Sequence, residues 1–203
     1  MHKKVITGVL AALMLTPAGT AAAEGGSSES APTLAEVLLA DGDQFDRNPF
    51  DYDIVTEAVL LFPDLVDAAS NPDAELTVFL PNDRAFRRLV ADLTGDRLRK
   101  EAEVFDAVAA LGTDTVGTVL RYHIVAGPPI SYDAATQSDG AMLTTLQGGS
   151  LEVDVKGRWG KRVRLIDADP DARDATVVHP EVGGAAANGY AHGINRVLRP
   201  VDL

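Results

Sequence analysis

Histidine is the residue type that most often serves in acid–base catalysis and transition-metal binding, and this chain has four. His2 lies in the N-terminal segment, and His123, His179 and His192 stand apart, at no spacing typical of a zinc site. The sequence holds no Gly-x-Ser-x-Gly, His-Glu-x-x-His or phosphate-loop motif. We therefore predict no catalytic residue, no enzyme activity and no cofactor. The alternative to a catalytic or metal-binding role for His123 and His192 is a buried imidazole, satisfied by the backbone or by a residue such as Asp83.

Carboxylates at alternate positions suggest a second kind of chemistry, calcium binding. Asp167, Asp169 and Asp171 follow this spacing, and Asp174 comes soon after. An EF-hand loop begins in the same way, but here alanine stands at the sixth position and valine at the twelfth, in place of glycine and glutamate. We interpret the stretch as a solvated turn between strands and keep these four aspartates as a weak metal-site candidate.

A basic, aromatic run on an acidic chain offers a third possibility, ligand binding. The only tryptophan, Trp159, lies among Arg158, Lys161 and Arg162. An indole ring flanked by cations can stack on a sugar or seat an anionic partner. The other interpretation is that Trp159 covers a core edge while the basic side chains are solvated.

The first residues are typical of a cleaved secretory signal. Lys3 and Lys4 precede an apolar run from Val5 to Leu15, and Ala21–Ala23 offers the small residues at which cleavage occurs. The run has roughly half of the about 20 apolar residues that a membrane-spanning helix needs. We therefore predict a signal peptide over residues 1–23, a flexible leader over 24–32 and one domain over 33–203. The expected location is outside the cell or in the cell envelope, with no integral membrane anchor.

Composition narrows the choice of partners. The formal net charge is −12, and the chain contains no cysteine, so neither a disulfide nor a lipoprotein anchor is available. Such a negative surface repels phosphate backbones, so nucleic acid is excluded as a partner. An unknown protein or glycan at the cell surface or matrix remains.

Hydrophobic periodicity changes along the chain from helix-like to strand-like. We expect helices that begin near residues 33, 53, 82, 98 and 115, with Asp53 and Thr115 as caps and a break at Pro63. A strand is expected at 76–80 and ends at Pro81, and further strands are expected at 124–125, 142–146, 151–155, 163–165, 176–178 and 189–198. Helices followed by strands indicate an α+β fold.

Three segments resemble the fasciclin domain family. Residues 77–86 (TVFLPNDRAF), 120–125 (LRYHIV) and 188–200 (NGYAHGINRVLRP) match its opening, middle and closing motifs in order, and the resemblance covers residues 33–203. In these motifs we interpret the following residues as structural: Thr77, Phe79, Pro81, Asp83, Phe86, Tyr122, His123, Asn188, Gly189 and His192. Small residues at 191 and 193 depart from the family pattern and suggest a repacked closing strand.

The resemblance implies a helix cluster packed against a β-wedge of short, mostly antiparallel strands. It also implies a secreted, bacterial, non-enzymatic domain for cell-surface or extracellular-matrix adhesion. The acidic–aliphatic pair proposed for integrin contact has no clear match before Asn188, so integrin binding is not expected. Two alternatives remain open: a small-ligand or lipid carrier, which needs an apolar cavity, and a calcium-dependent structural domain built on the aspartates of 167–174.

Overall fold

The computed structural model describes residues 30–40, 45–158 and 162–201 and has the predicted α+β architecture. Its helices are α1 (Leu34–Ala40), α2 (Asp53–Leu60), α3 (Pro63–Ser70), α4 (Asp83–Thr94), α5 (Glu101–Ala109), α6 (Thr113–Tyr122) and α7 (Tyr132–Ala135). Its strands are β1 (Leu76–Pro81), β2 (Ile124–Ala126), β3 (Met142–Thr144), β4 (Ser150–Lys156), β5 (Arg162–Ile166), β6 (Ala175–His179), β7 (Ala185–Ala186) and β8 (Gly189–Ile194). The short elements α7 and β7 are the ones that the sequence pattern does not predict.

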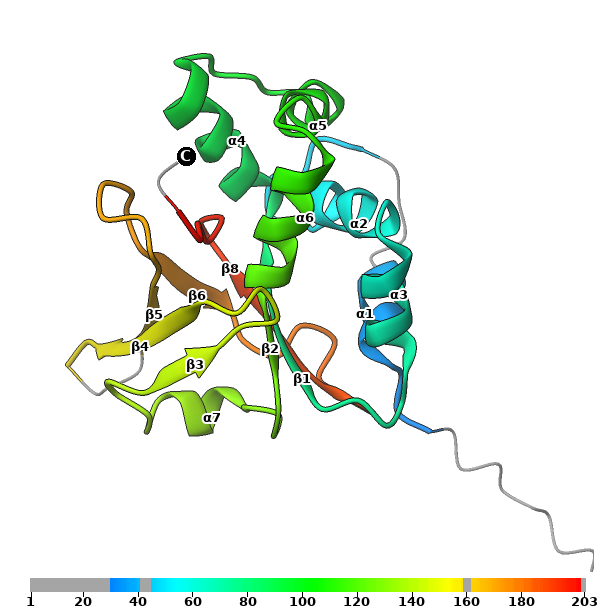
Figure 1. Ribbon diagram of the computed structural model, residues 1–203, viewed down its shortest axis with the longest axis vertical. Coiled ribbons are helices and arrows are strands. Elements are labelled where there is room, and N and C mark those ends of the chain that lie inside the picture. Colours follow the sequence, from blue (N-terminus) through cyan, green and yellow to red (C-terminus); the bar gives the residue numbers. More distant parts are fainter. Residues whose placement is uncertain (1–29, 41–44, 159–161, 202–203) are drawn as a thin grey trace, which may run out of the picture.

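The strands form one bent sheet in the order β2-β1-β8-β6-β5-β4-β3, with β7 beside β8 (Figure 1). Neighbouring strands are antiparallel except β1 and β8, which run parallel. A bridge between Val125 and Thr145 brings the two ends of this order together. The sheet is therefore a nearly closed wedge, as the family resemblance implies.

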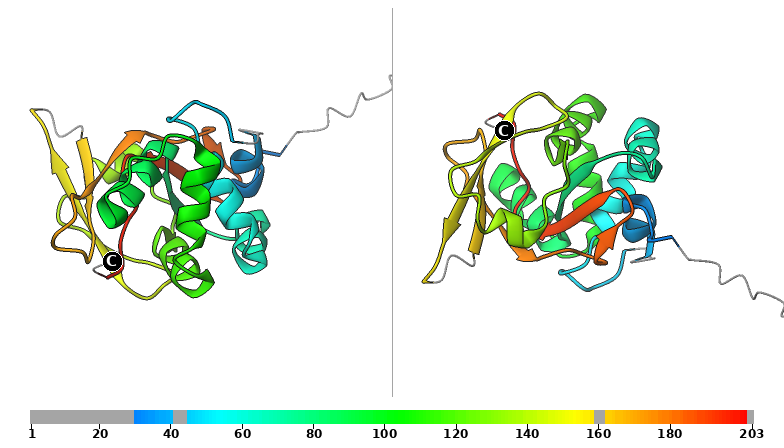
Figure 2. Two further views of the ribbon diagram at one scale, coloured as in Figure 1. Left: turned by 90° about the horizontal axis from the view of Figure 1, so that it is seen from above. Right: turned by 90° about the horizontal axis from the view of Figure 1, so that it is seen from below.

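Strand β1 separates two hydrophobic cores. Val78 and Leu80 pack with the helices, whereas Phe79 points into the wedge, because successive strand side chains face opposite ways. Helices α1–α6 gather on one side of β1 and β8, and strands β3–β5 with α7 lie on the other (Figures 1 and 2). None of the described helices has both the length and the apolar character needed to cross a bilayer.

Helix termini follow the sequence in some places and depart from it in others. Thr33 and Glu36 make a reciprocal capping box at the predicted helix start near residue 33, and the predicted break at Pro63 is where α3 begins, with Pro63 as its first residue. Asp53 does not cap α2: it is the first helical residue, and the Asp83 carboxylate instead accepts the Ile54 N–H at 3.1 Å.

One further boundary prediction is wrong. Helix α6 already begins at Thr113, after Gly112, so Thr115 lies inside its first turn rather than before it. Strand β1 ends at Pro81, as predicted, and Pro81 lies opposite Ile194 of β8. Asn82 then caps α4 and accepts the Ala85 N–H at 3.0 Å.

Candidate functional site

His123 follows the last turn of α6 and is buried. Its Nδ1 lies 2.7 Å from the Val119 carbonyl, and its Nε2 accepts the Leu198 N–H at 2.9 Å. Because a carbonyl only accepts, Nδ1 carries the proton and the ring is neutral. Burial lowers the pKa of His123 to about 4, against the opposing effect of the Val119 carbonyl. Both nitrogens thus join α6 to the closing segment, through the backbone and not through Asp83.

His192 on β8 has the same character. Its Nε2 lies 2.8 Å from the Ile130 carbonyl, and its Nδ1 accepts the Glu181 N–H at 3.3 Å. Burial lowers the pKa of this imidazole, although the Ile130 carbonyl opposes the shift. The ring stacks beside Tyr190 with centroids 6.3 Å apart. His179 is exposed and pairs with the Tyr52 hydroxyl at 3.1 Å, so the structure does not bring the three histidines together.

Asn188 joins three separate segments. Its side-chain oxygen accepts the Leu34 N–H at 2.8 Å, and its amide nitrogen donates to the carbonyls of Ala69 (2.8 Å) and Asn71 (3.0 Å). Gly189 follows with φ +152°, and a Cβ at this position would lie 1.9 Å from the Leu76 carbonyl oxygen. Asn188 and Gly189 therefore hold α1, the end of α3 and β1 together, and we call such a set of buried contacts a structural lock.

Side chains of the opening and middle motifs also make hydrogen bonds to the backbone of distant segments. The Thr77 hydroxyl accepts the Ile130 N–H at 2.9 Å, and the Tyr122 hydroxyl donates to the Ser150 carbonyl at 2.7 Å. Burial raises the pKa of Tyr122 to about 12. Buried alongside them are Phe79, Pro81, Asp83 and Phe86.

The departure at position 193 has a physical reason. A Cβ on Gly193 would lie 2.0 Å from the Tyr52 hydroxyl, which fills the space that a larger side chain would occupy. The predicted repacking of the closing strand is therefore explained by one tyrosine from the segment before α2.

The carboxylates of the 167–174 loop bind the protein itself. Asp167 accepts the N–H groups of Asp169 (3.1 Å) and Arg199 (2.9 Å). Asp169 is buried, accepts the N–H groups of Asp171 (3.0 Å) and Ala172 (3.1 Å), and pairs with the Arg199 guanidinium at 3.1 Å. Asp174 lies 3.5 Å from Arg164. These partners account for the loop geometry, and calcium binding there stays a prediction.

The basic run lies at the end of the β4–β5 hairpin. Lys156 and Arg162 pair across the two strands, and Arg158 and Arg162 are exposed. Trp159 and Lys161 lie outside the described residues, as does the predicted signal peptide.

The wedge encloses a cavity of about 240 Å³, which we call the wedge cavity. One wall is the 128–138 segment with α7, and the other is made of inward-facing strand side chains, among them Phe79, Val153, Val163 and Leu165. The His192 ring also lines it, but both of its nitrogens are bound to the backbone. The lining is mostly apolar, with Thr77, Tyr132 and Ser138 as its other polar residues, and an apolar cavity is the feature that a small-ligand carrier needs.

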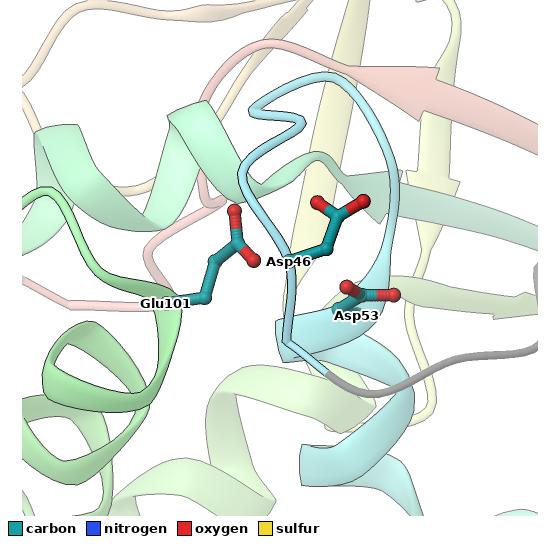
Figure 3. A group of neighbouring side chains, drawn as sticks. All are labelled: Asp46, Asp53 and Glu101. Carbon is teal, nitrogen blue, oxygen red and sulfur yellow. The ribbon is translucent and has the colours of Figure 1, made fainter.

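A set of carboxylates lies where α2, α4 and α5 begin, and we call it the acidic cluster: Asp46, Asp51, Asp53, Asp83 and Glu101. One carboxylate oxygen from each of Asp46, Asp53 and Glu101 lies within 4.8 Å of the others (Figure 3). A second group, Asp51, Asp53 and Asp83, meets the same limit.

Burial shifts the acidities of two members of the acidic cluster. It raises the pKa of Asp83 to about 9, an effect that the Ile54 N–H opposes and that neighbouring Asp51 strengthens. It also raises the pKa of Glu101, although the Arg87 guanidinium acts in the opposite direction. In the sequence, Asp83 and Glu101 look like ordinary acidic residues in the first turn of a helix, so the sequence alone does not reveal the cluster.

Comparison with known proteins agrees with this architecture. The fasciclin domain family model matches residues 55–200. None of the curated proteins matches the chain. Among solved structures, a FAS1 domain pair from the insect cell adhesion molecule Fasciclin I superposes with a TM-score of 0.59 at 18% identity. The match covers 84% of this chain, and the chain spans about half (51%) of that structure.

The motifs that make the structural locks fall inside the matched region, and the sheet and helix arrangement is that of a FAS1 domain. The chain belongs to the fasciclin domain family.

Proposed function

We propose that this chain is exported and acts as a non-enzymatic binding domain in adhesion at the cell surface or extracellular matrix. The observation that carries the proposal is its FAS1 fold, shared with a domain pair of a cell adhesion molecule. A signal peptide over residues 1–23 fits this role, since an adhesion domain has to reach the outside of the cell.

The state of the histidines supports the non-enzymatic part of the proposal. A general base needs an accessible nitrogen near its substrate and a pKa near the working pH. His123 and His192 are buried, have lowered pKa values and use both ring nitrogens in hydrogen bonds to the backbone. Neither has the geometry of an acid–base catalyst.

We propose that Arg158, Trp159, Lys161 and Arg162, in the stretch of sequence that links β4 to β5, contact the partner, and we call this stretch the hairpin end. Arg158 and Arg162 are exposed, on a protein of formal net charge −12. A local positive site on a negative protein favours a partner with anionic groups, such as an acidic glycan or an acidic protein surface.

A glycan array with the chain from residue 24 onward tests this surface. The comparison is between the unchanged protein, Trp159→Ala, and the double variant Arg158→Ala/Arg162→Ala. The matched control is Arg97→Ala/Arg99→Ala, which removes the same charge from an exposed loop elsewhere. We expect binding to acidic glycans to be lost in the first two variants and retained in the control. Equal binding by all four proteins would reject the hairpin end as the contact surface.

The wedge cavity favours a second candidate function, carriage of a small apolar ligand. An apolar cavity of about 150 Å³ is already large enough to bind benzene, and the wedge cavity is larger, at about 240 Å³. Displacement of a fluorescent apolar dye by short-chain fatty acids would measure it. Ala135→Leu, on α7, fills the cavity and should abolish dye binding while the protein stays folded. Unchanged dye affinity in this variant would exclude the cavity as the binding site.

A further inference from the structure

The acidic cluster brings five carboxyl groups close together where three helices begin. Among the described residues, Arg87 makes an ion pair with one of them, Glu101, at 2.7 Å. Helices α2, α4 and α5 also point their N-termini at the cluster, and each N-terminus is equivalent to about half a positive charge. Asp83, with its pKa raised to about 9, is protonated at neutral pH, and the other carboxylates of the cluster supply the negative charge that attracts a divalent cation.

Glu101 points to where such a cation would lie. Its side chain is fully buried, and its Oε1 is the atom that pairs with Arg87. Its Oε2 has no hydrogen-bond partner of normal geometry in the described part of the chain, although the Asp46 N–H lies close enough to the carboxylate to act against the rise in its pKa. Figure 3 shows the Glu101 carboxylate turned toward Asp46. Buried acceptors nearly always have a partner, so an unmatched carboxylate oxygen beside two further carboxylates indicates a missing ligand.

The spacing of the three carboxylates suits calcium. Oxygens bound to one calcium ion lie 2.3–2.6 Å from it, so two of them are at most about 5 Å apart. The oxygens of Asp46, Asp53 and Glu101 meet that limit, since they lie within 4.8 Å of one another. Asp46 is exposed, which gives an ion a route from solvent, whereas Asp53 and Glu101 are buried.

We propose that Asp46, Asp53 and Glu101 bind a divalent cation, with calcium as the ion that the predicted export makes available. Water and backbone oxygens complete the six to eight ligands that calcium takes. Asp51 and Asp83 adjoin the site through Asp53 without being ligands. The bound ion fastens the loop before α2 to the first turn of α5. This site is separate from the 167–174 loop and from the hairpin end.

Terbium luminescence and thermal unfolding test the proposal on the chain from residue 24 onward, first stripped with EDTA. Tyr52 lies between two members of the acidic cluster and can sensitise a terbium ion bound there. For a dissociation constant of about 0.1 mM, 5 mM calcium should raise the melting temperature by about 5 °C. Calcium should also displace the terbium signal.

Two variants remove ligands, and two controls leave the site intact. Asp46→Asn and Glu101→Gln should each weaken terbium binding at least about tenfold. Glu103→Gln, on the exposed side of the same helix, and Asp171→Asn, in the other acidic loop, should bind as the unchanged protein does. Because Asp46 is exposed, its variant should remain folded even if Glu101→Gln does not. The proposal is overturned if calcium leaves the melting temperature unchanged, if Asp46→Asn binds terbium normally, or if Asp171→Asn alone abolishes binding.

Discussion

Replacing Asn188 by alanine tests whether the family motifs are structural locks. The change removes three hydrogen bonds and leaves the buried Leu34 N–H and the half-buried Ala69 carbonyl without their Asn188 partner, whereas the Asn71 carbonyl keeps the Ala74 N–H at 3.1 Å. Each buried backbone group left unsatisfied costs about 1–3 kcal/mol. We expect a loss of about 3–5 kcal/mol, a large part of the 5–15 kcal/mol or so that stabilises a typical domain.

Urea unfolding measures this loss. With a slope near 2 kcal/mol per molar urea, the midpoint should fall by about 2 M. Hydrogen exchange should also increase across α1, because Asn188 holds the first residue of this helix. Asn195→Ala is the matched control: Asn195 is half-buried and accepts one N–H, from Thr176, so it should cost about 1 kcal/mol. If the two variants lose the same stability, Asn188 is not the lock that we describe.

Three further predictions concern the same framework. His123 has a folded pKa of about 4 against an ordinary 6.5, so its contribution is present above pH 6.5 and is lost as the pH falls toward 4. Unfolding free energies at pH 7 and 4.5 should therefore differ less in His123→Gln than in the unchanged protein, and an equal difference would contradict the burial argument. Gly189→Ala should prevent folding at 37 °C, because its Cβ would overlap the Leu76 carbonyl; near-native circular dichroism would refute this. Tyr122→Phe should cost only about 1 kcal/mol in urea unfolding, since it removes one hydrogen bond and keeps the ring, and a loss above about 3 kcal/mol would show a larger role.

Local pattern was sufficient for much of the fold. Alternation along β1 is enough to place Val78 and Leu80 in one core and Phe79 in the other, because successive side chains of a strand point to opposite faces. Caps made by distant residues are not visible in this way. Asp83 caps α2 from another helix, and this partner depends on how α2 and α4 pack.

The candidate sites also combine features that neighbouring residues determine with features that only tertiary packing determines. That His123 is a buried, satisfied ring follows from its motif, but its actual partners, Val119 and Leu198, come from the fold. The acidic cluster forms only when three helix N-termini meet, and the wedge cavity depends on how tightly side chains fill the sheet interior. Neither the acidic cluster nor the wedge cavity can be predicted from the order of residues, since both arise from long-range packing.

The most direct test of the adhesion proposal is equilibrium binding of the fluorescently labelled chain, from residue 24 onward, to intact cells and matrix of the producing organism. We predict saturable binding that excess unlabelled protein displaces and that His123→Gln, if folded, retains. Binding that rises linearly with concentration and resists competition would contradict the proposal that this fasciclin domain is an adhesion module.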